Sequence, residues 1–203
     1  MKINSLMIPN PITITEKASV SEAIELMKIN SIRHLPVVSE KNLLAGLVTL
    51  ADLKQGLIPS MVAGVTLSDL IIKNPITVGP DDDIEIAAKL IYKHKIGGMP
   101  VVKKGKVVGI ITGTDILRTF IEMMGMLTAS SRIDVVIGEE PGAFKQALHI
   151  INDNGGDIIS VGMTAQPASK RIYYFRLFAC KTDIIKKALK KEGFEVIAAM
   201  AMD

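Results

Sequence analysis

The apolar and polar positions of residues 1–124 follow one order, and they follow it twice. In the first copy, a short NPITI motif at 10–14 precedes a stripe of apolar residues at helical spacing, including Ala23 and Met27, with Ser19 or Ser21 in position to cap the helix. Two apolar runs joined by a polar turn then predict a hairpin. The predicted elements are a helix over 20–30 and strands at 35–38 and 43–48.

The second copy repeats this pattern in step with the first. NPITV at 74–78 matches NPITI, PVV at 100–102 matches PVV at 36–38, and GIITGTD at 109–115 matches GLVTLAD at 46–52. Such a period fixes the folding unit, here a strand, a helix, a hairpin and a second helix. The second-copy elements are a helix over 84–94 and strands at 99–102 and 107–111. The predicted boundaries are residues 1–64 for the first repeat and 65–127 for the second.

Each copy ends with a threonine and an aspartate at the start of a helix: Thr49 with Asp52, and Thr112 with Asp115. A carboxylate can accept hydrogen bonds from both hydroxyls of a ribose, and a threonine hydroxyl with helix N-terminal amides can hold ribose or phosphate oxygens. The same residues can also do no more than cap their helices, which is the simpler explanation for an isolated T-x-x-D.

An N-P-x-T strand, an amphipathic helix, a P-V-V strand and a final G-x-x-T-x-x-D together resemble the CBS domain, which occurs as tandem pairs called Bateman modules. The resemblance covers residues 1 to about 124 and implies nucleotide sites in a cleft between the repeats. In this family the final Thr and Asp hold the ribose and phosphate, and the opposite repeat sandwiches the adenine.

The resemblance therefore implies two residue sets. The set for the site of Thr49 and Asp52 is Ile76, Ile96, Gly97, Gly98, Met99 and Pro100. The set for the site of Thr112 and Asp115 is Ile12, Ile32, Arg33, His34, Leu35 and Pro36. Arg33 and His34 are basic where the second copy has two glycines, so we expect them to serve the phosphates of the site that carries Thr49 and Asp52.

The repeat ends at residue 127. Residues 128–203 form a different domain, which begins with a polar segment at 128–131. Periodicity predicts strands at 132–137, 157–162, 171–179 and 194–201 and helices at 142–152 and 182–191. The order βαββαβ is that of the ferredoxin-like fold, with two helices on one face of a four-stranded antiparallel sheet.

This domain resembles the ACT domain, a regulatory module that binds amino acids and other small molecules. The resemblance places its ligand loop at Glu139, Glu140, Pro141 and Gly142. Two glutamates depart from a typical carboxylate-binding loop, so amino-acid binding stays open. In the aromatic strand, Tyr174 and Phe178 lie on one face and Tyr173 and Phe175 on the other, which favours packing within a dimer over base stacking.

Composition narrows the function classes. A net charge of +3 in 203 residues argues against nucleic-acid binding. No apolar run reaches the roughly 18 residues of a membrane helix, so we expect a soluble, cytoplasmic protein. Cys180 is the only cysteine, and His34, His94 and His149 fall in different predicted elements, which gives neither a metal site nor a catalytic constellation.

The predicted fold class is α+β: duplicated CBS units forming a Bateman module, and a C-terminal ferredoxin-like, ACT-type domain. The predicted function is a non-catalytic sensor of an adenosine-containing ligand, AMP, ADP, ATP or S-adenosylmethionine, with no catalytic cofactor. We expect a homodimer that regulates a metabolic enzyme in trans, by analogy with the acetoin-utilisation protein class. The alternative is an interaction scaffold with degenerate sites, and a hydrolase hidden in the C-terminal domain is a distant third.

Overall fold

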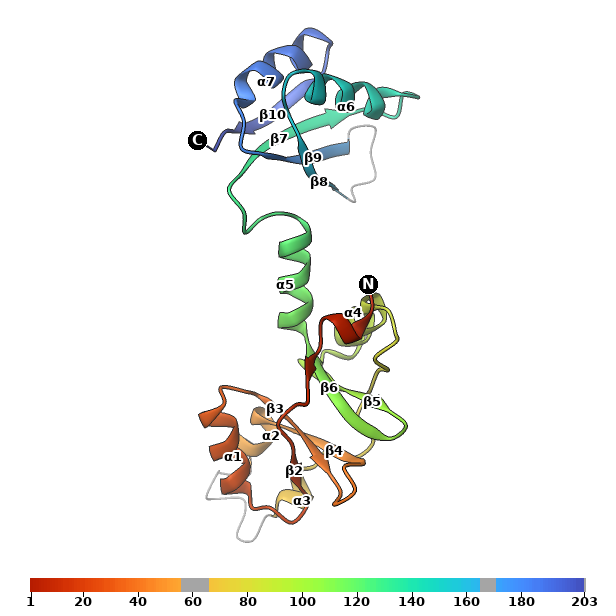
Figure 1. The fold of residues 1–203 in the computed structure, drawn as a ribbon, viewed down its shortest axis with the longest axis vertical. Helices are drawn as coiled ribbons and strands as arrows, with labels where there is room; N and C mark the ends of the chain where they lie inside the picture. The colour runs from red at the N-terminus through yellow and green to blue at the C-terminus, as the bar shows by residue number, and fades with distance from the viewer. Residues whose placement is uncertain (56–65, 165–170, 203) are drawn as a thin grey trace. The chain divides into compact units, whose positions relative to one another are not determined.

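The computed structural model describes residues 1–55, 66–164 and 171–202 (Figure 1). The chain divides into two compact units, Met1–Leu117 and Arg118–Asp203. Each unit is described by itself below. The predicted boundary between the repeats at residues 64–65 lies outside the described residues.

The first repeat forms a three-stranded sheet of β2 (Ile14–Thr15), β3 (His34–Val38) and β4 (Leu44–Thr49). Its helices are α1 (Val20–Ile29) and α2 (Leu50–Gln55). Ser19 caps α1 as predicted: its hydroxyl accepts from the Glu22 N–H, and the Glu22 carboxylate accepts from the Ser19 N–H. This capping box fixes the start of the helix whose inner residues, Ala23 and Met27, are buried in the core.

The second repeat has the same arrangement. Its elements are α3 (Leu67–Leu70), α4 (Ile84–His94), β5 (Gly98–Lys103), β6 (Lys106–Thr112) and α5 (Gly113–Met123). β5 and β6 pair antiparallel, as β3 and β4 do. A parallel bridge between Val78 and Val101 takes the place of the β2–β3 pairing. The predicted helices and hairpins of both repeats are therefore confirmed.

The segment leading into each repeat packs on the other repeat. Before the first repeat come η1 (Ile3–Ser5) and β1 (Ile8–Pro9), and β1 pairs with β6 of the second repeat while Ile3 is fully buried in its core. In the same way, Leu67 is buried in the core of the first repeat, and Ile72 exchanges backbone hydrogen bonds of 2.8 and 3.1 Å with Leu47. This exchange makes the stability of each repeat depend on the other.

The second unit contains β7 (Ser130–Ile137), α6 (Ala143–Asp153), β8 (Ile158–Met163), β9 (Arg171–Phe178), α7 (Thr182–Lys191) and β10 (Glu195–Met200). Its antiparallel sheet has the order β10-β7-β9-β8, and α6 and α7 lie on one side of it (Figure 1). Ile133, Val135 and Phe175 are fully buried beneath the helices. The predicted βαββαβ order is confirmed, and with it the α+β class.

The polar segment predicted at 128–131 is only partly a connection. Ser130 and Ser131 belong to β7, and Ser131 is fully buried. Its hydroxyl accepts from the N–H groups of Cys180 and Met202 and donates to the Cys180 carbonyl, at 3.0, 3.2 and 3.1 Å. Three hydrogen bonds compensate the burial of a residue whose polarity suggested a loop.

The faces of the aromatic strand alternate as predicted. Phe175 is buried under the helices with Tyr173 beside it, and their rings are 6.4 Å apart. Tyr174 lies on the opposite face next to Arg132, and Phe178 is 56% exposed. Among the described residues, no helix is long and apolar enough to cross a membrane.

Candidate ligand-binding site

The threonine and aspartate that end each repeat have the same hydrogen-bond geometry in both copies. The Thr49 N–H and hydroxyl donate to Asp52 Oδ2 at 3.1 and 2.5 Å, and the Asp52 N–H donates back to Thr49 Oγ1 at 3.3 Å. For Thr112 and Asp115 the three distances are 2.8, 2.6 and 3.4 Å. All four residues are partly exposed.

A third threonine–aspartate pair forms a cap of the same type elsewhere. The Thr66 N–H and hydroxyl donate to Asp69 Oδ2 at 2.9 and 2.7 Å at the start of α3, and the Asp69 N–H donates to the Thr66 carbonyl at 3.1 Å. This pair went unnoticed in the sequence, because it follows no apolar strand and has no counterpart in the repeat. The cap geometry alone therefore does not distinguish a ligand site from an ordinary helix start.

His34, the first residue of β3, and Gly97, the residue before β5, lie close to each other. A Cβ atom added to Gly97 would lie 2.6 Å from Nε2 of His34. The backbone at each of these points is also tied to the end of its own repeat: the Leu50 N–H donates to the Arg33 carbonyl, and the Gly113 N–H donates to the Gly97 carbonyl, both at 2.9 Å. Within the strands, His34 pairs with Thr49 and Gly98 pairs with Thr112. The structure thus gathers residues from both predicted sets around His34 and Gly97.

The electrostatics of this region centre on His34. Burial lowers the pKa of His34 below its ordinary value of 6.5, the Arg33 charge lowers the pKa further, and the Asp52 carboxylate opposes both effects. Arg33 is itself exposed. His34 therefore pairs with Thr49 and senses the Asp52 carboxylate, and the exposed Arg33 precedes it in the chain.

The remaining predicted residues lie in or against the core of their own repeat. Leu35 and Met99 are fully buried there. Pro36 and Pro100 are buried within β3 and β5. The four predicted isoleucines are partly buried, Ile12 and Ile32 against the first core and Ile76 and Ile96 against the second.

The predicted ACT-like loop lies at the start of α6. Glu139, Glu140, Pro141 and Gly142 are all exposed, and Glu139 Oε1 is 3.6 Å from Nη2 of Arg171. Gly142 is the N-cap residue, with φ of 90°. Pro141 precedes the helix, which begins at Ala143, one residue later than predicted.

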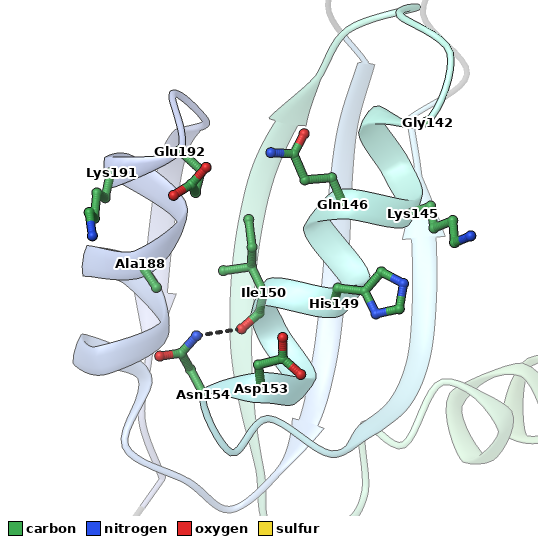
Figure 2. Close-up of a pocket in the computed structure, with 10 residues that line it drawn as sticks. All are labelled: Gly142, Lys145, Gln146, His149, Ile150, Asp153, Asn154, Ala188, Lys191 and Glu192. Carbon is green, nitrogen blue, oxygen red and sulfur yellow. Dashed lines mark hydrogen bonds between the residues drawn. The ribbon is translucent and has the colours of Figure 1, made fainter.

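Gly142 also lines a cavity of about 550 Å³ between α6 and α7. Figure 2 shows Ile150 and Ala188 on the sides of the two helices that face each other, whereas Lys145 and His149 point away from α7. The Asn154 side chain donates to the Ile150 carbonyl at 2.8 Å. The groove carries charges of both signs, among them Asp153, Lys191 and Glu192, so its lining favours no single charge of ligand.

Within residues 1–55, 66–164 and 171–202, no group of three or more histidine, cysteine, aspartate and glutamate side chains is placed to hold a metal ion. The chemistry of the gathered residues is that of hydrogen bonding to hydroxyls and anions.

Comparison with known proteins agrees with this description. The profile of the CBS domain matches residues 3–58 and again residues 67–122. Among curated proteins, a homoserine O-acetyltransferase of Methanocorpusculum labreanum is 39% identical over 115 residues, which are 55% of this chain and 23% of that protein. The chain thus spans about a quarter of that relative, and the similarity does not extend to the whole acetyltransferase.

Three solved structures share the fold of the paired repeats. The CBS domain pair of protein MJ0100, in complex with 5′-methylthioadenosine and S-adenosyl-L-methionine, is 31% identical with a TM-score of 0.56 and covers 59% of this chain and 95% of its own. An acetoin utilization protein (AcuB) from Vibrio cholerae has the same identity and TM-score over 62% of this chain and 94% of its own. CBSX2 from Arabidopsis thaliana in complex with AMP is 27% identical with a TM-score of 0.53, over 60% and 96%.

The two profile matches coincide with the two copies of the strand, helix and hairpin unit, and together they cover more than half of the chain. The solved CBS pairs named above carry adenosine-containing ligands in two cases. The chain belongs to the CBS domain family and carries two CBS domains in tandem.

Proposed function

We propose that this chain is a non-catalytic sensor that binds an adenosine-containing ligand at its CBS pair. The observation that carries the proposal is the duplicated Thr–Asp pair, at equivalent strand ends and with matching hydrogen bonds, next to the His34–Gly97 contact between the repeats. A symmetric pair of hydroxyl-binding carboxylates suits ligands that carry a ribose.

The Asp52 carboxylate can accept further hydrogen bonds, such as those from a ribose. Both hydrogen bonds that it accepts from Thr49 go to Oδ2, and an ionised carboxylate can accept about four hydrogen bonds. Oδ1 is then the atom that receives the ribose hydroxyls. The solved relatives support an adenosine ligand, since they hold 5′-methylthioadenosine, S-adenosyl-L-methionine and AMP.

The two sites differ in charge. Arg33 and His34 would give the site of Thr49 and Asp52 a preference for phosphate, and a bound anion would favour the protonated imidazole. The equivalent glycines, Gly97 and Gly98, add no charge. An adenosine phosphate is therefore the proposed ligand of the first site, and the second site accepts an adenosyl compound with less negative charge.

The residues proposed to hold the adenine stay as the family resemblance gives them. They are Ile76, Ile96, Gly97, Gly98, Met99 and Pro100 for the first site, and Ile12, Ile32, Arg33, His34, Leu35 and Pro36 for the second. Because Leu35 and Met99 are fully buried, their contribution would be through the backbone rather than the side chain.

We further propose that the C-terminal unit acts as an ACT-like module that passes the signal to a metabolic enzyme, and that the protein works as a homodimer. The βαββαβ order with strands β10-β7-β9-β8 and the exposed loop before α6 support this assignment. The ligand can transmit a signal only if it binds one arrangement of the protein better than another.

One observation favours a second candidate, a scaffold whose sites are empty. Thr66 and Asp69 form the same cap with no part in either site, so the caps at Thr49 and Thr112 need no ligand to explain them. The two functions differ in their response to nucleotides.

A thermal-shift screen of the whole chain against S-adenosylmethionine, 5′-methylthioadenosine, AMP, ADP and ATP distinguishes them, because a ligand that binds only the native state raises the melting temperature. The sensor predicts a concentration-dependent rise that disappears in the double variant Asp52→Ala, Asp115→Ala. The scaffold predicts no rise with any of the five compounds.

A further inference from the structure

The face of the C-terminal sheet opposite α6 and α7 carries two arginines in direct cross-strand register. Arg132 of β7 pairs with Arg176 of β9, and residues paired in this way project from the same face of a sheet. Like charges placed directly opposite each other destabilise a sheet unless they are compensated. Arg132 and Arg176 differ in how their positive charges are compensated.

Arg132 is compensated within the fold. Its Nε and Nη2 donate to the two carboxylate oxygens of Asp134 at 2.7 and 2.8 Å, and its guanidinium lies 4.9 Å from the centre of the Tyr174 ring. The Asp134 side chain is only 7% exposed. The hydrogen bonds that Arg132 donates to the Asp134 carboxylate raise the pKa of Arg132. The two side chains therefore form a closed, neutral pair.

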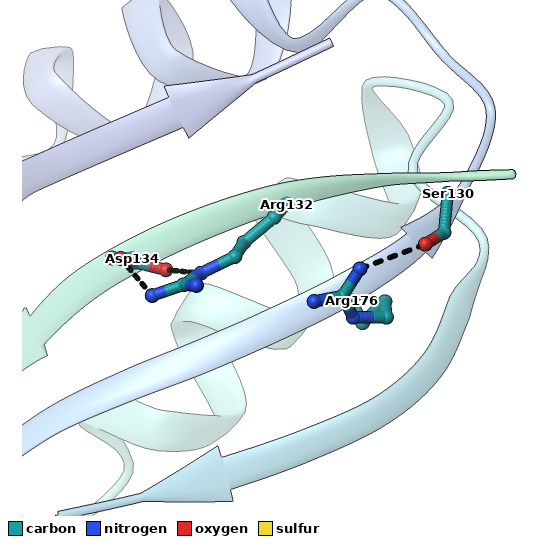
Figure 3. Close-up of polar contacts among 4 residues, drawn as sticks. All are labelled: Ser130, Arg132, Asp134 and Arg176. Carbon is teal, nitrogen blue, oxygen red and sulfur yellow. Dashed lines mark hydrogen bonds and ion pairs between the residues drawn. The ribbon is translucent and has the colours of Figure 1, made fainter. Parts of the chain in front are cut away.

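Arg176 has no such partner. Its Nη1 donates to the hydroxyl of Ser130 at 2.9 Å (Figure 3), and no carboxylate among the described residues forms an ion pair with it. The Ser130 hydroxyl in turn donates to the Gly125 carbonyl at 3.3 Å. Around Arg132, Asp134 and Arg176 one positive charge is left over, and Arg176 carries it.

This charge faces a small, mostly apolar pocket. The pocket measures about 240 Å³ and is lined by Met124, Met126, Arg132, Tyr174, Phe175 and Arg176. The segment that follows α5 forms one wall and is fixed in place, because the Met124 carbonyl accepts from the Ser160 hydroxyl at 2.9 Å. The Met124 methyl group also lies over Gly162, 3.1 Å from where a Cβ would be.

We propose that this pocket binds a small carboxylate with a short apolar chain. The Arg176 guanidinium would hold the carboxylate, since arginine can donate two parallel hydrogen bonds to it. The two methionines and Tyr174 would enclose the chain, because methionine adapts to irregular apolar shapes. The volume is below the range of about 300 to 1,000 Å³ typical of larger ligands, which limits the chain to a few carbons. The lining of this pocket shares no residue with the proposed nucleotide sites or with the loop before α6.

The test uses the whole chain labelled with ¹³C at the methionine methyl groups, with 3-methylbutanoate as the probe and 3-methylbutanamide as its uncharged match. The signals of Met124 and Met126 are assigned from single Met→Leu variants. We expect saturable shifts of both signals with the acid, and at least tenfold weaker binding of the amide.

Three variants test whether the positive charge of Arg176 holds the carboxylate. Arg176→Gln should reduce binding of the acid at least tenfold, and Arg176→Lys should reduce it less. Arg171→Gln, on the same strand but outside the pocket, should leave binding unchanged. Arg176→Gln removes a like charge from opposite Arg132, so the variant should stay folded, and the dispersion of its methyl spectrum checks this.

Equal affinities for acid and amide would overturn the proposal, as would binding of the acid that survives Arg176→Gln, or no saturable binding of either compound. Sedimentation of the parent and of Arg176→Gln tests one more outcome, in which a second copy of the chain supplies the carboxylate. In that case the parent would be a dimer, Arg176→Gln would be a monomer, and the Met124 signal of the parent would not respond to the acid. This result would also overturn the proposal.

Discussion

The imidazole of His34 in the first repeat lies against Gly97 in the second, so closely that a Cβ at Gly97 would be 2.6 Å from Nε2 and 2.8 Å from Cε1. Glycine at this position therefore sets where the imidazole can lie. Because His34 is also paired with Thr49 in the sheet, the contact links the two repeats at the edge of the proposed ligand site.

Gly97→Ala should move the His34 ring. The clashing atoms are at the free end of a side chain, so the ring can rotate away, and we expect a loss of stability of about 1 kcal/mol, the low end for overpacking. The clearer effect should be on His34 itself: less burial should bring its pKa back toward the ordinary value. A pH titration of the His34 ring signals by NMR measures this shift.

Gly138→Ala is the matched control for that substitution. Apart from its chain neighbours, no described residue lies within 4 Å of a Cβ at Gly138, so neither the melting temperature nor the His34 titration should change. If neither Gly97→Ala nor Gly138→Ala changed the pKa of His34, the contact between the repeats would be absent in solution.

The depressed pKa of His34 predicts a pH dependence of stability. Burial is the largest cause, followed by Arg33, so between the folded-state pKa and 6.5 the unfolded chain binds more protons than the native state. Stability then rises with pH through this window and falls as pH drops through it. We expect the melting temperature of the parent to fall more steeply from about pH 8 to about pH 5 than that of His34→Asn.

His94 and His149 are present in both proteins, so the difference between the parent and His34→Asn isolates His34. Parallel melting curves across this range would show that His34 has an ordinary pKa. A bound adenosine phosphate should reduce the difference, since its negative charge favours the protonated ring.

Sequence periodicity predicted α1, α4, α6, α7 and most strands to within about two residues, because each of these elements has one apolar face at a single regular spacing. It did not predict where the lead-in segments pack. The sequences SLMI at 5–8 and DLII at 69–72 correspond at the spacing of the repeat, so both lead-ins belong to it. Pairing of β1 with β6, however, is a long-range contact that local patterning does not encode.

The polar features that were missed have a similar cause. Ser131 looked like part of a loop, and only its three hydrogen bonds to distant backbone groups explain its burial. Arg132 and Arg176 are opposite each other only through strand register. The sequence does carry one signal of this polar face, because Arg132 and Asp134 alternate with Ile133 and Val135. This alternation marks a strand with one polar face and one face in the core.

Because the segment before the first repeat packs on the second repeat, a substitution in this segment should destabilise the second repeat. Ile3 is fully buried in the second core, and truncating a buried isoleucine to alanine costs about 2–5 kcal/mol. In Ile3→Ala, hydrogen exchange should therefore accelerate first in β5 and β6 rather than in β3 and β4. Exchange measured by mass spectrometry on the intact chain resolves the two hairpins.

Ile8→Ala serves as the control, since Ile8 lies in the same lead-in but is 50% exposed. It should change the exchange of neither hairpin appreciably. Faster exchange confined to β3 and β4 in Ile3→Ala would mean that the lead-in packs on its own repeat.

The charge difference between the two proposed sites predicts unequal effects of removing their aspartates. Asp52→Ala should weaken binding of an adenosine phosphate more than Asp115→Ala does, because Arg33 and His34 lie beside Thr49 and Asp52. Loss of a hydrogen bond to a charged group costs about 1.5–3 kcal/mol, or roughly tenfold to a hundredfold in affinity. Isothermal titration of AMP and ATP into each variant measures the ranking.

Both substitutions also remove a helix cap, and a lower stability could be mistaken for a lost ligand contact. Asp69→Ala separates the two effects, because Asp69 makes the same cap with Thr66 outside either site. It should lower the melting temperature and leave the affinity for AMP and ATP unchanged. If the three variants bound the nucleotides as tightly as the parent, the duplicated Thr–Asp pairs would be caps alone and the sensor function would fail with them. If Asp115→Ala alone lost binding, the ranking would be wrong and Arg33 and His34 would not select the site.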